Sequence, residues 1–104
     1  MKVKDFRARI SAMMGEIQTI VNESGDIARY LARKYARDGE ARNAVSRGIR
    51  EIQHLKGYLA YYGARSDNEE CDQAMLDVIT HCEEILRKRH ETLAHLRHLK
   101  AQCP

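Results

Sequence analysis

The fold of this chain is decided by residues 3–31, VKDFRARISAMMGEIQTIVNESGDIARYL. Apolar residues recur there at steps of three and four, and polar residues fill the positions between them. This spacing is typical of a helix that buries one narrow stripe against nearly parallel neighbouring helices. Only Ser24 interrupts the stripe, which comprises Val3, Phe6, Ile10, Met13, Ile17, Ile20, Ile27 and Leu31.

The first helix is expected to run over about residues 3–36. Its segment 22–26 (NESGD) contains residues that favour helix caps and breaks, so the helix could bend or end at Gly25. The apolar stripe keeps its phase across this segment, which favours one continuous helix. Asp38 and Gly39 then predict a turn.

Two further helices are expected after this turn, over about residues 40–62 and 67–101. The second ends at Gly63, and the third opens with a capping box formed by Asp67 and Glu70. The apolar face of the second helix comprises Val45, Ile49, Ile52, Leu55, Leu59 and Tyr62, with Gly48 beside it. The third helix carries two adjoining apolar stripes and is expected to contact more than one neighbour.

Short turns make sequential helices antiparallel, so we expect an all-α, up-down-up bundle of three helices in one domain, residues 1–104. The first and third helices are predicted to be longer than the second. Unpaired apolar surface should therefore remain at the ends of the long pair. A partner chain would cover it, in a homodimer or a hetero-complex with coiled-coil-like packing.

Composition limits the class of protein. Apolar residues make up 43% of the chain and charged residues 32%, and the formal net charge is +3. The periodic apolar residues argue against disorder, and the short apolar runs exclude a membrane span. No signal peptide is recognised, so a cytoplasmic location is expected. Three cysteines at wide spacings imply neither a disulfide framework nor a zinc ribbon.

The individual cysteines have different expected environments. Cys71 and Cys82 fall on the apolar face of the third helix and are expected to be reduced core residues. Cys103 is next to the last residue and is expected to be an exposed, reactive thiol.

Two groups of residues are predicted to bind a protein partner. If the C-terminal ends of the first and third helices meet, Arg33, Arg37, Arg87 and Lys88 contribute to a basic pole that suits an acidic protein surface. The alternative is that the acidic start and basic finish of the third helix merely complement its macrodipole. Tyr58 and Tyr61 are the second group, because tyrosine is enriched at protein interfaces.

A nucleic-acid interface is the alternative. Residues around Gly39 partly match a helix-turn-helix, in which Arg42, Asn43, Arg47 and Arg50 would contact bases and phosphates. A plain helical hairpin with a solvated face explains the same residues.

Catalysis is not expected. The sequence offers no evident nucleophile–base arrangement, carboxylate pair or phosphate-binding loop. His95 and His98 can face one side of a helix, but zinc needs three or four ligands. We therefore expect no metal, cofactor or small-molecule substrate. The predicted function is a non-catalytic protein-interaction module, such as an adaptor, a chaperone-like protein or a regulatory subunit, with a nucleic-acid-binding regulator as the alternative.

Overall fold

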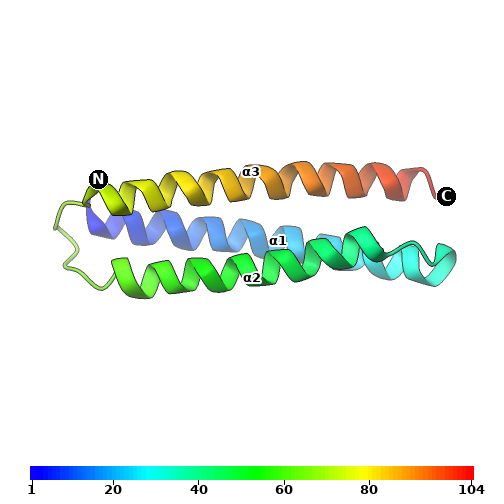
Figure 1. The fold of residues 1–104 in the computed structure, drawn as a ribbon, viewed down its shortest axis with the longest axis horizontal. Helices are drawn as coiled ribbons and strands as arrows, with labels where there is room; N and C mark the ends of the chain where they lie inside the picture. Colours follow the sequence, from blue (N-terminus) through cyan, green and yellow to red (C-terminus); the bar gives the residue numbers. More distant parts are fainter.

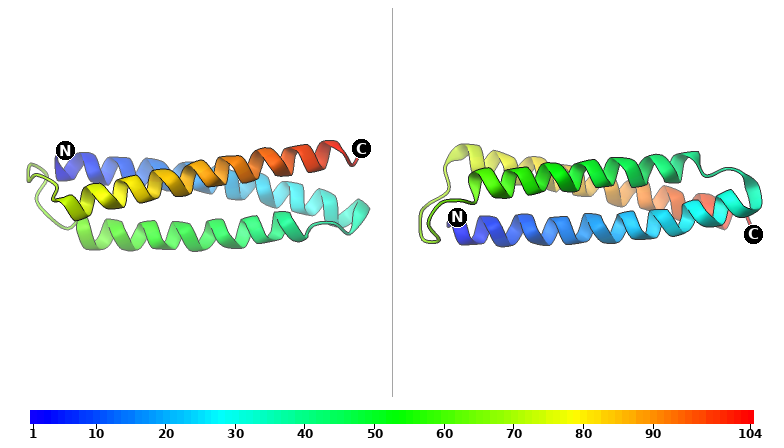
Figure 2. Two further views of the ribbon diagram at one scale, coloured as in Figure 1. Left: turned by 45° about the horizontal axis from the view of Figure 1, so that its top comes forward. Right: turned by 90° about the horizontal axis from the view of Figure 1, so that it is seen from below.

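The computed structural model describes residues 1–104 as three helices packed into a rod about 53 × 18 × 16 Å (Figure 1). The helices are α1 (Val3–Tyr35), α2 (Gly39–Tyr62) and α3 (Gln73–Ala101), and there is no strand. A long loop joins α2 to α3 at the end of the rod where the chain begins (Figure 2). None of the helices contains a stretch long and apolar enough to cross a lipid bilayer.

Helix α1 is the central element of the packing. Its predicted stripe is confirmed, because all eight apolar residues and Ser24 are buried. The helix continues without a break through Gly25, as the phase of the stripe indicated. Helices α2 and α3 each pack extensively against α1 and less extensively against each other.

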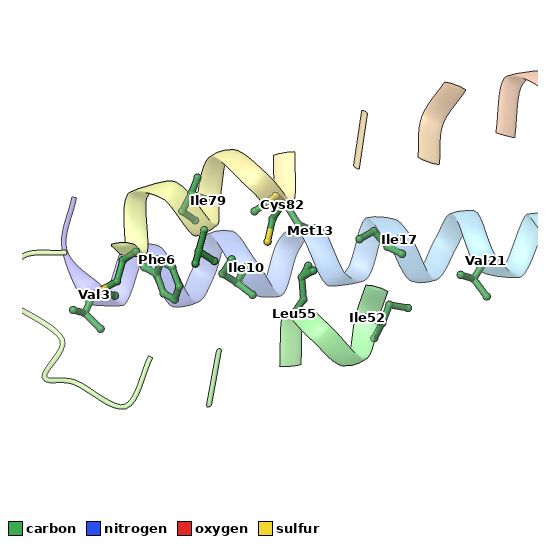
Figure 3. Close-up of a cluster of buried hydrophobic side chains, with 12 residues drawn as sticks. Val3, Phe6, Ile10, Met13, Ile17, Val21, Ile52, Leu55, Ile79 and Cys82 are labelled. Carbon is green, nitrogen blue, oxygen red and sulfur yellow. The ribbon is translucent and has the colours of Figure 1, made fainter. Parts of the chain in front are cut away.

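The core consists of two clusters along the rod. The first joins the N-terminal part of α1 to Ile52 and Leu55 of α2 and to Ile79 and Cys82 of α3 (Figure 3). Burial raises the pKa of the Cys82 thiol to about 11. The second cluster lies near the other end of the rod and joins Ile20, Ile27, Ala28, Leu31, Ala41, Ala44, Leu93, Leu96 and Cys103.

The second cluster contradicts two expectations. The apolar residues near the ends of α1 and α3 are buried against each other and against Ala41 and Ala44, so the expected unpaired apolar surface is absent. Cys103 is 7% exposed, not a free surface thiol. The physical reason is that the chain after α3 folds back against α1, where the Tyr30 hydroxyl donates to the carbonyl of Cys103 at 2.6 Å.

The predicted apolar face of α2 was wrong in its first half. Ile49 is 46% exposed and Val45 is only partly buried. Ala41, Ala44 and Gly48 are buried instead. Ala41 and Ala44 were overlooked, and Gly48 was placed only beside the face, because a hydrophobic pattern emphasises large side chains. Small residues instead allow two helix backbones to approach closely.

The start of α3 was also misplaced. The helix begins at Gln73, and the carboxylate of Asp72 caps it by accepting from the Met75 N–H at 3.0 Å. Residues 67–71 instead lie beside the beginning of α1. The carbonyls of Glu69 and Asp67 accept from the N–H groups of Val3 and Lys4 at 2.9 and 3.1 Å. The predicted cap residue Asp67 therefore caps α1 through its backbone.

Gly48 is the position where close helix approach is most sensitive to substitution. A Cβ atom there would lie 2.3 Å from Cγ2 of Val21. Gly48→Ala should therefore destabilise the protein by about 1–3 kcal/mol through overpacking. Gly57→Ala is the matched control, because nothing lies within 4 Å of its Cβ position. That change should stabilise α2 by about 0.5–1 kcal/mol. Urea unfolding of both variants measures the difference, and equal effects would contradict the close approach.

Candidate partner-binding face

A buried ion pair links α2 to α3 between the two apolar clusters. Nε of Arg89 lies 3.2 Å from Oε1 of Glu51, and the two side chains are 7% and 14% exposed. Neither these two atoms nor Nη1 of Arg89 has a well-aligned hydrogen-bond partner. Arg89 thus occupies a core position between apolar residues of α3.

Burying this ion pair has a large desolvation cost. Burial raises the pKa of the Glu51 carboxyl, although Arg89, Arg47, His54 and Arg50 act in the opposite direction. Desolvation of two charges commonly cancels their attraction, whereas removing one partner costs about 3–5 kcal/mol. The pair therefore adds little net stability, but removing either partner would destabilise the contact between α2 and α3.

Two further contacts bridge α2 and α3 nearer the surface. The carboxylate of Glu40 lies 2.8 Å from Nε2 of His95. The rings of Tyr58 and His81 meet edge to face with centroids 6.4 Å apart. As the residue number rises along α2, that of its partner on α3 falls, so the two helices run in opposite directions.

A seven-residue repeat extends along both sides of this seam. It comprises Glu40, Arg47, His54 and Tyr61 on α2 and His81, Lys88 and His95 on α3, and we call these seven residues the α2–α3 face. Residues seven apart lie on nearly the same side of a helix. The Glu51–Arg89 and Tyr58–His81 contacts place Arg47 and Lys88 on opposite sides of the seam, about one helical turn out of step along it.

The middle of this face has positive side chains on both helices. Neither Arg47 nor Lys88 makes an ion pair within 4 Å, and both are exposed. The nearby carboxylates already form ion pairs with other residues. Glu51 pairs with Arg89, and both Glu84 and Glu91 pair with Arg87. The seam between α1 and α3 differs, because its charges pair across the helices as Arg9 with Glu83 and Glu23 with Arg97.

The predicted basic pole is not assembled. Arg33 and Arg37 lie at the end of α1, but Arg87 and Lys88 lie in the middle of α3. Arg87 is 14 residues before the end of that helix, a distance of about 21 Å at 1.5 Å per residue. It lies beside residues 9–16 of α1. The error arose because residues 87–104 were treated as one basic segment at the C-terminal end of the third helix, although Arg87 and Lys88 lie near its middle.

At the end of the rod the cations gather around Tyr30. The ammonium groups of Lys34 and Lys100 lie 5.3 and 5.1 Å from its ring centroid. Both lysines belong to the last turns of their helices, where a positive charge complements the macrodipole. The helix macrodipoles therefore suffice to explain why lysines occupy these two positions.

The two predicted tyrosines have different environments. Tyr58 is half-buried between Tyr62 and His81. Tyr61 is 77% exposed, and its ring rests against Tyr62 with centroids 4.9 Å apart.

The predicted nucleic-acid residues do not form one surface. Arg42 lies in a groove between α1 and α2 and pairs with Asp38 at 3.6 Å. Asn43, Arg47 and Arg50 are exposed on α2, and their spacing turns them away from Arg42 toward the α3 side.

No three His, Cys, Asp or Glu side chains converge as metal ligands. Comparison with known proteins adds no relative, since no family model, curated protein or solved structure matches this chain.

Sequence reasoning missed the Glu51–Arg89 pair and the repeat beside it. The signal was present, because Arg89 continues the three- and four-residue steps from Leu86 to Leu93 and Leu96. A charged residue in such a series indicates either exposure or a buried partner. Only the position of α2 identifies Glu51 as that partner.

The pH dependence of stability should reveal the buried carboxyl. Because the native pKa of Glu51 is raised, its favourable contribution is present below the ordinary glutamate pKa and is lost as pH rises through the native value. The wild type should therefore lose stability relative to Glu51→Gln between pH 4 and pH 7. Urea unfolding at several pH values measures this, with exposed Glu16→Gln as the control. A constant difference across this range would contradict the raised pKa.

The juxtaposition of Arg47 and Lys88 can be tested by a double-mutant cycle. Lys88→Glu should be more favourable with Arg47 present than in an Arg47→Glu background, by about 0.5 kcal/mol for an exposed pair. Urea unfolding at low salt gives the coupling. A cycle of Lys88→Glu with Lys56→Glu is the control, because Lys56 lies on the other flank of α2. Equal coupling in both cycles would show that Arg47 and Lys88 are not neighbours.

Proposed function

We propose that this chain is a non-catalytic binding module that docks an acidic protein partner on the α2–α3 face. The observation that carries the proposal is the placement of Arg47 and Lys88 on neighbouring helices with no carboxylate paired to either. An acidic partner would neutralise this charge and guide the encounter.

Helix macrodipoles do not account for these two cations. Arg47 and Lys88 each lie more than two turns from the ends of their helices. The macrodipole acts within the first and last turns. In this respect they differ from Lys34 and Lys100, which occupy helix ends.

Tyr61 adds contact area of a kind that protein interfaces favour. It continues the line of Glu40, Arg47 and His54 and is 77% exposed. Its packing on Tyr62 limits the motion that would be lost on binding.

The exposed surface favours a hetero-complex over a homodimer. The large exposed hydrophobic residues are only Met1, Ile49 and Tyr61. Homodimer interfaces are usually richer in apolar area than this. An adaptor or regulatory subunit that recognises charge fits this surface better than a self-associating coiled coil.

A nucleic-acid-binding regulator remains the second candidate, favoured by the exposed Arg47 and Arg50 on one side of α2. Two observations weigh against it. Arg42 is directed to Asp38, and the net charge is only +3. Phosphate binding generally uses a larger basic surface.

Capture from a lysate of the native host tests the function. Immobilised wild type should retain a protein that is lost from the variant carrying Arg47→Glu and Lys88→Glu, since the binding surface has been reversed. The control carries Lys4→Glu and Lys56→Glu, which change the charge equally at exposed positions elsewhere. Circular dichroism confirms that all three proteins are helical.

Two outcomes would overturn the proposal. The first is recovery of the same proteins by both double variants. The second is capture that disappears after nuclease treatment and weakens steeply with salt, which would establish the nucleic-acid alternative.

A further inference from the structure

Two ion pairs cross the seam between α1 and α3, and they share one register. Arg9 binds Glu83 at 3.0 Å, and Glu23 binds Arg97 further along the rod. In both pairs the residue on α3 follows its partner on α1 by 74 positions. The equal offset means that the two helices run parallel and stay in step between the two pairs.

The place midway between these pairs belongs to Glu16 on α1 and His90 on α3. They are related by the same offset of 74, and each lies seven residues from the paired residues on its own helix. Both side chains are exposed, and both line one groove between the two helices. No ion pair within 4 Å joins them, in contrast to the pairs on either side.

The remaining charged groups beside His90 already have partners. Helix α2 contributes no side chain to the groove, and its floor of Ala12, Met13 and Leu86 carries no charge. Glu16 is therefore the one carboxylate facing His90 that has no cation paired to it. The ion pairs around the groove are Arg9 with Glu83, Arg87 with both Glu84 and Glu91, and Arg97 with Glu23.

We infer that Glu16 and His90 form a third ion pair across this seam when the imidazole is protonated. An imidazole ordinarily gains its proton as the pH falls from about 7 to 6, a range in which glutamate is ionised. The proton gives His90 a positive charge opposite the unpaired carboxylate. Mild acidification therefore completes a row of three ion pairs and strengthens the contact between α1 and α3.

The bundle already contains a contact of this kind. Across the seam between α2 and α3, the carboxylate of Glu40 lies 2.8 Å from Nε2 of His95, and both side chains are exposed. A glutamate and an imidazole on adjacent helices of this rod thus reach each other without burial. The seam between α1 and α3 lies outside the α2–α3 face, so this inference does not depend on the proposed function.

A double-mutant cycle of Glu16→Gln and His90→Gln tests the pair. Urea unfolding at low salt should give a coupling of about twofold in the unfolding equilibrium constant at pH 5.5, and none at pH 8. The sign follows from linkage, because a stabilising contact of a protonated histidine is lost as the pH rises. The control cycle combines Glu16→Gln with His98→Gln and should show no coupling, since His98 is exposed but does not line the groove.

The variant His90→Arg separates the geometry from the proton. Arginine is charged at both pH values, so its coupling to Glu16 should appear at pH 5.5 and at pH 8. High salt should weaken this coupling, because the pair is exposed. Glu16→Gln also serves above as the control for Glu51, and in the His90→Gln background it does so without the contribution of this pair.

Three results would overturn the inference. Coupling between Glu16 and His90 that is equal at pH 5.5 and pH 8 would exclude a role for the proton. Coupling of the same size in the His98 cycle would reduce the effect to the general charge of α3. Absence of coupling at pH 5.5 would exclude the pair itself, whether or not His90→Arg couples to Glu16.

Discussion

The whole structure depends on one constraint, which is that a single stripe along α1 has to be covered by two other helices. The stripe extends from Val3 to Leu31 and is buried throughout. Helix α2 approaches it closely through Ala41, Ala44 and Gly48, whereas α3 covers it with larger side chains. Because both helices are positioned by α1, their contact with each other is the weakest of the three. The exposed seam and its charges follow from this arrangement.

The Glu51–Arg89 pair adds a second constraint on this contact. Both helices are already held against α1, on the side of α2 by the close fit of Gly48 against Val21. A buried pair with few hydrogen bonds favours one register strongly, because any displacement leaves a charge desolvated and unpaired. The pair thus reinforces the arrangement that packing against α1 sets.

The sequence predicted the central helix and its stripe, apart from the buried Val21 and Ala28, and the other two helices less well, for physical reasons. Eight large apolar residues at steps of three and four predict α1, because only a helix places residues at these steps on one side. On α2 the buried positions are occupied by alanine and glycine, whose contribution depends on how near the neighbouring backbone lies. The start of α3 was misplaced because Asp67 is followed by Glu70 in a capping-box pattern, whereas the actual cap, Asp72, is followed by Met75 at that position.

The candidate site was predicted only in part. Lys88, Arg47 and Tyr61 were singled out in three separate contexts, and all three are exposed in the structure. Arg33, Arg37 and Arg87 were grouped with Lys88 by charge, but they lie elsewhere. Hydrophobic periodicity does not determine which residues of α2 lie opposite which residues of α3. Only contacts in the folded structure, such as that between Glu40 and His95, show this.

The loop before α3 has a consequence for the order of assembly. The first N–H groups of α1 are bonded by carbonyls of residues 67 and 69, which are separated from them by more than sixty positions in the chain. During synthesis α1 is therefore complete before the carbonyls that cap its first turn exist. That end is closed only after α2 and the following loop have been synthesised. Closure of this end of the rod therefore requires contacts between residues distant in the chain, although the fold is entirely helical.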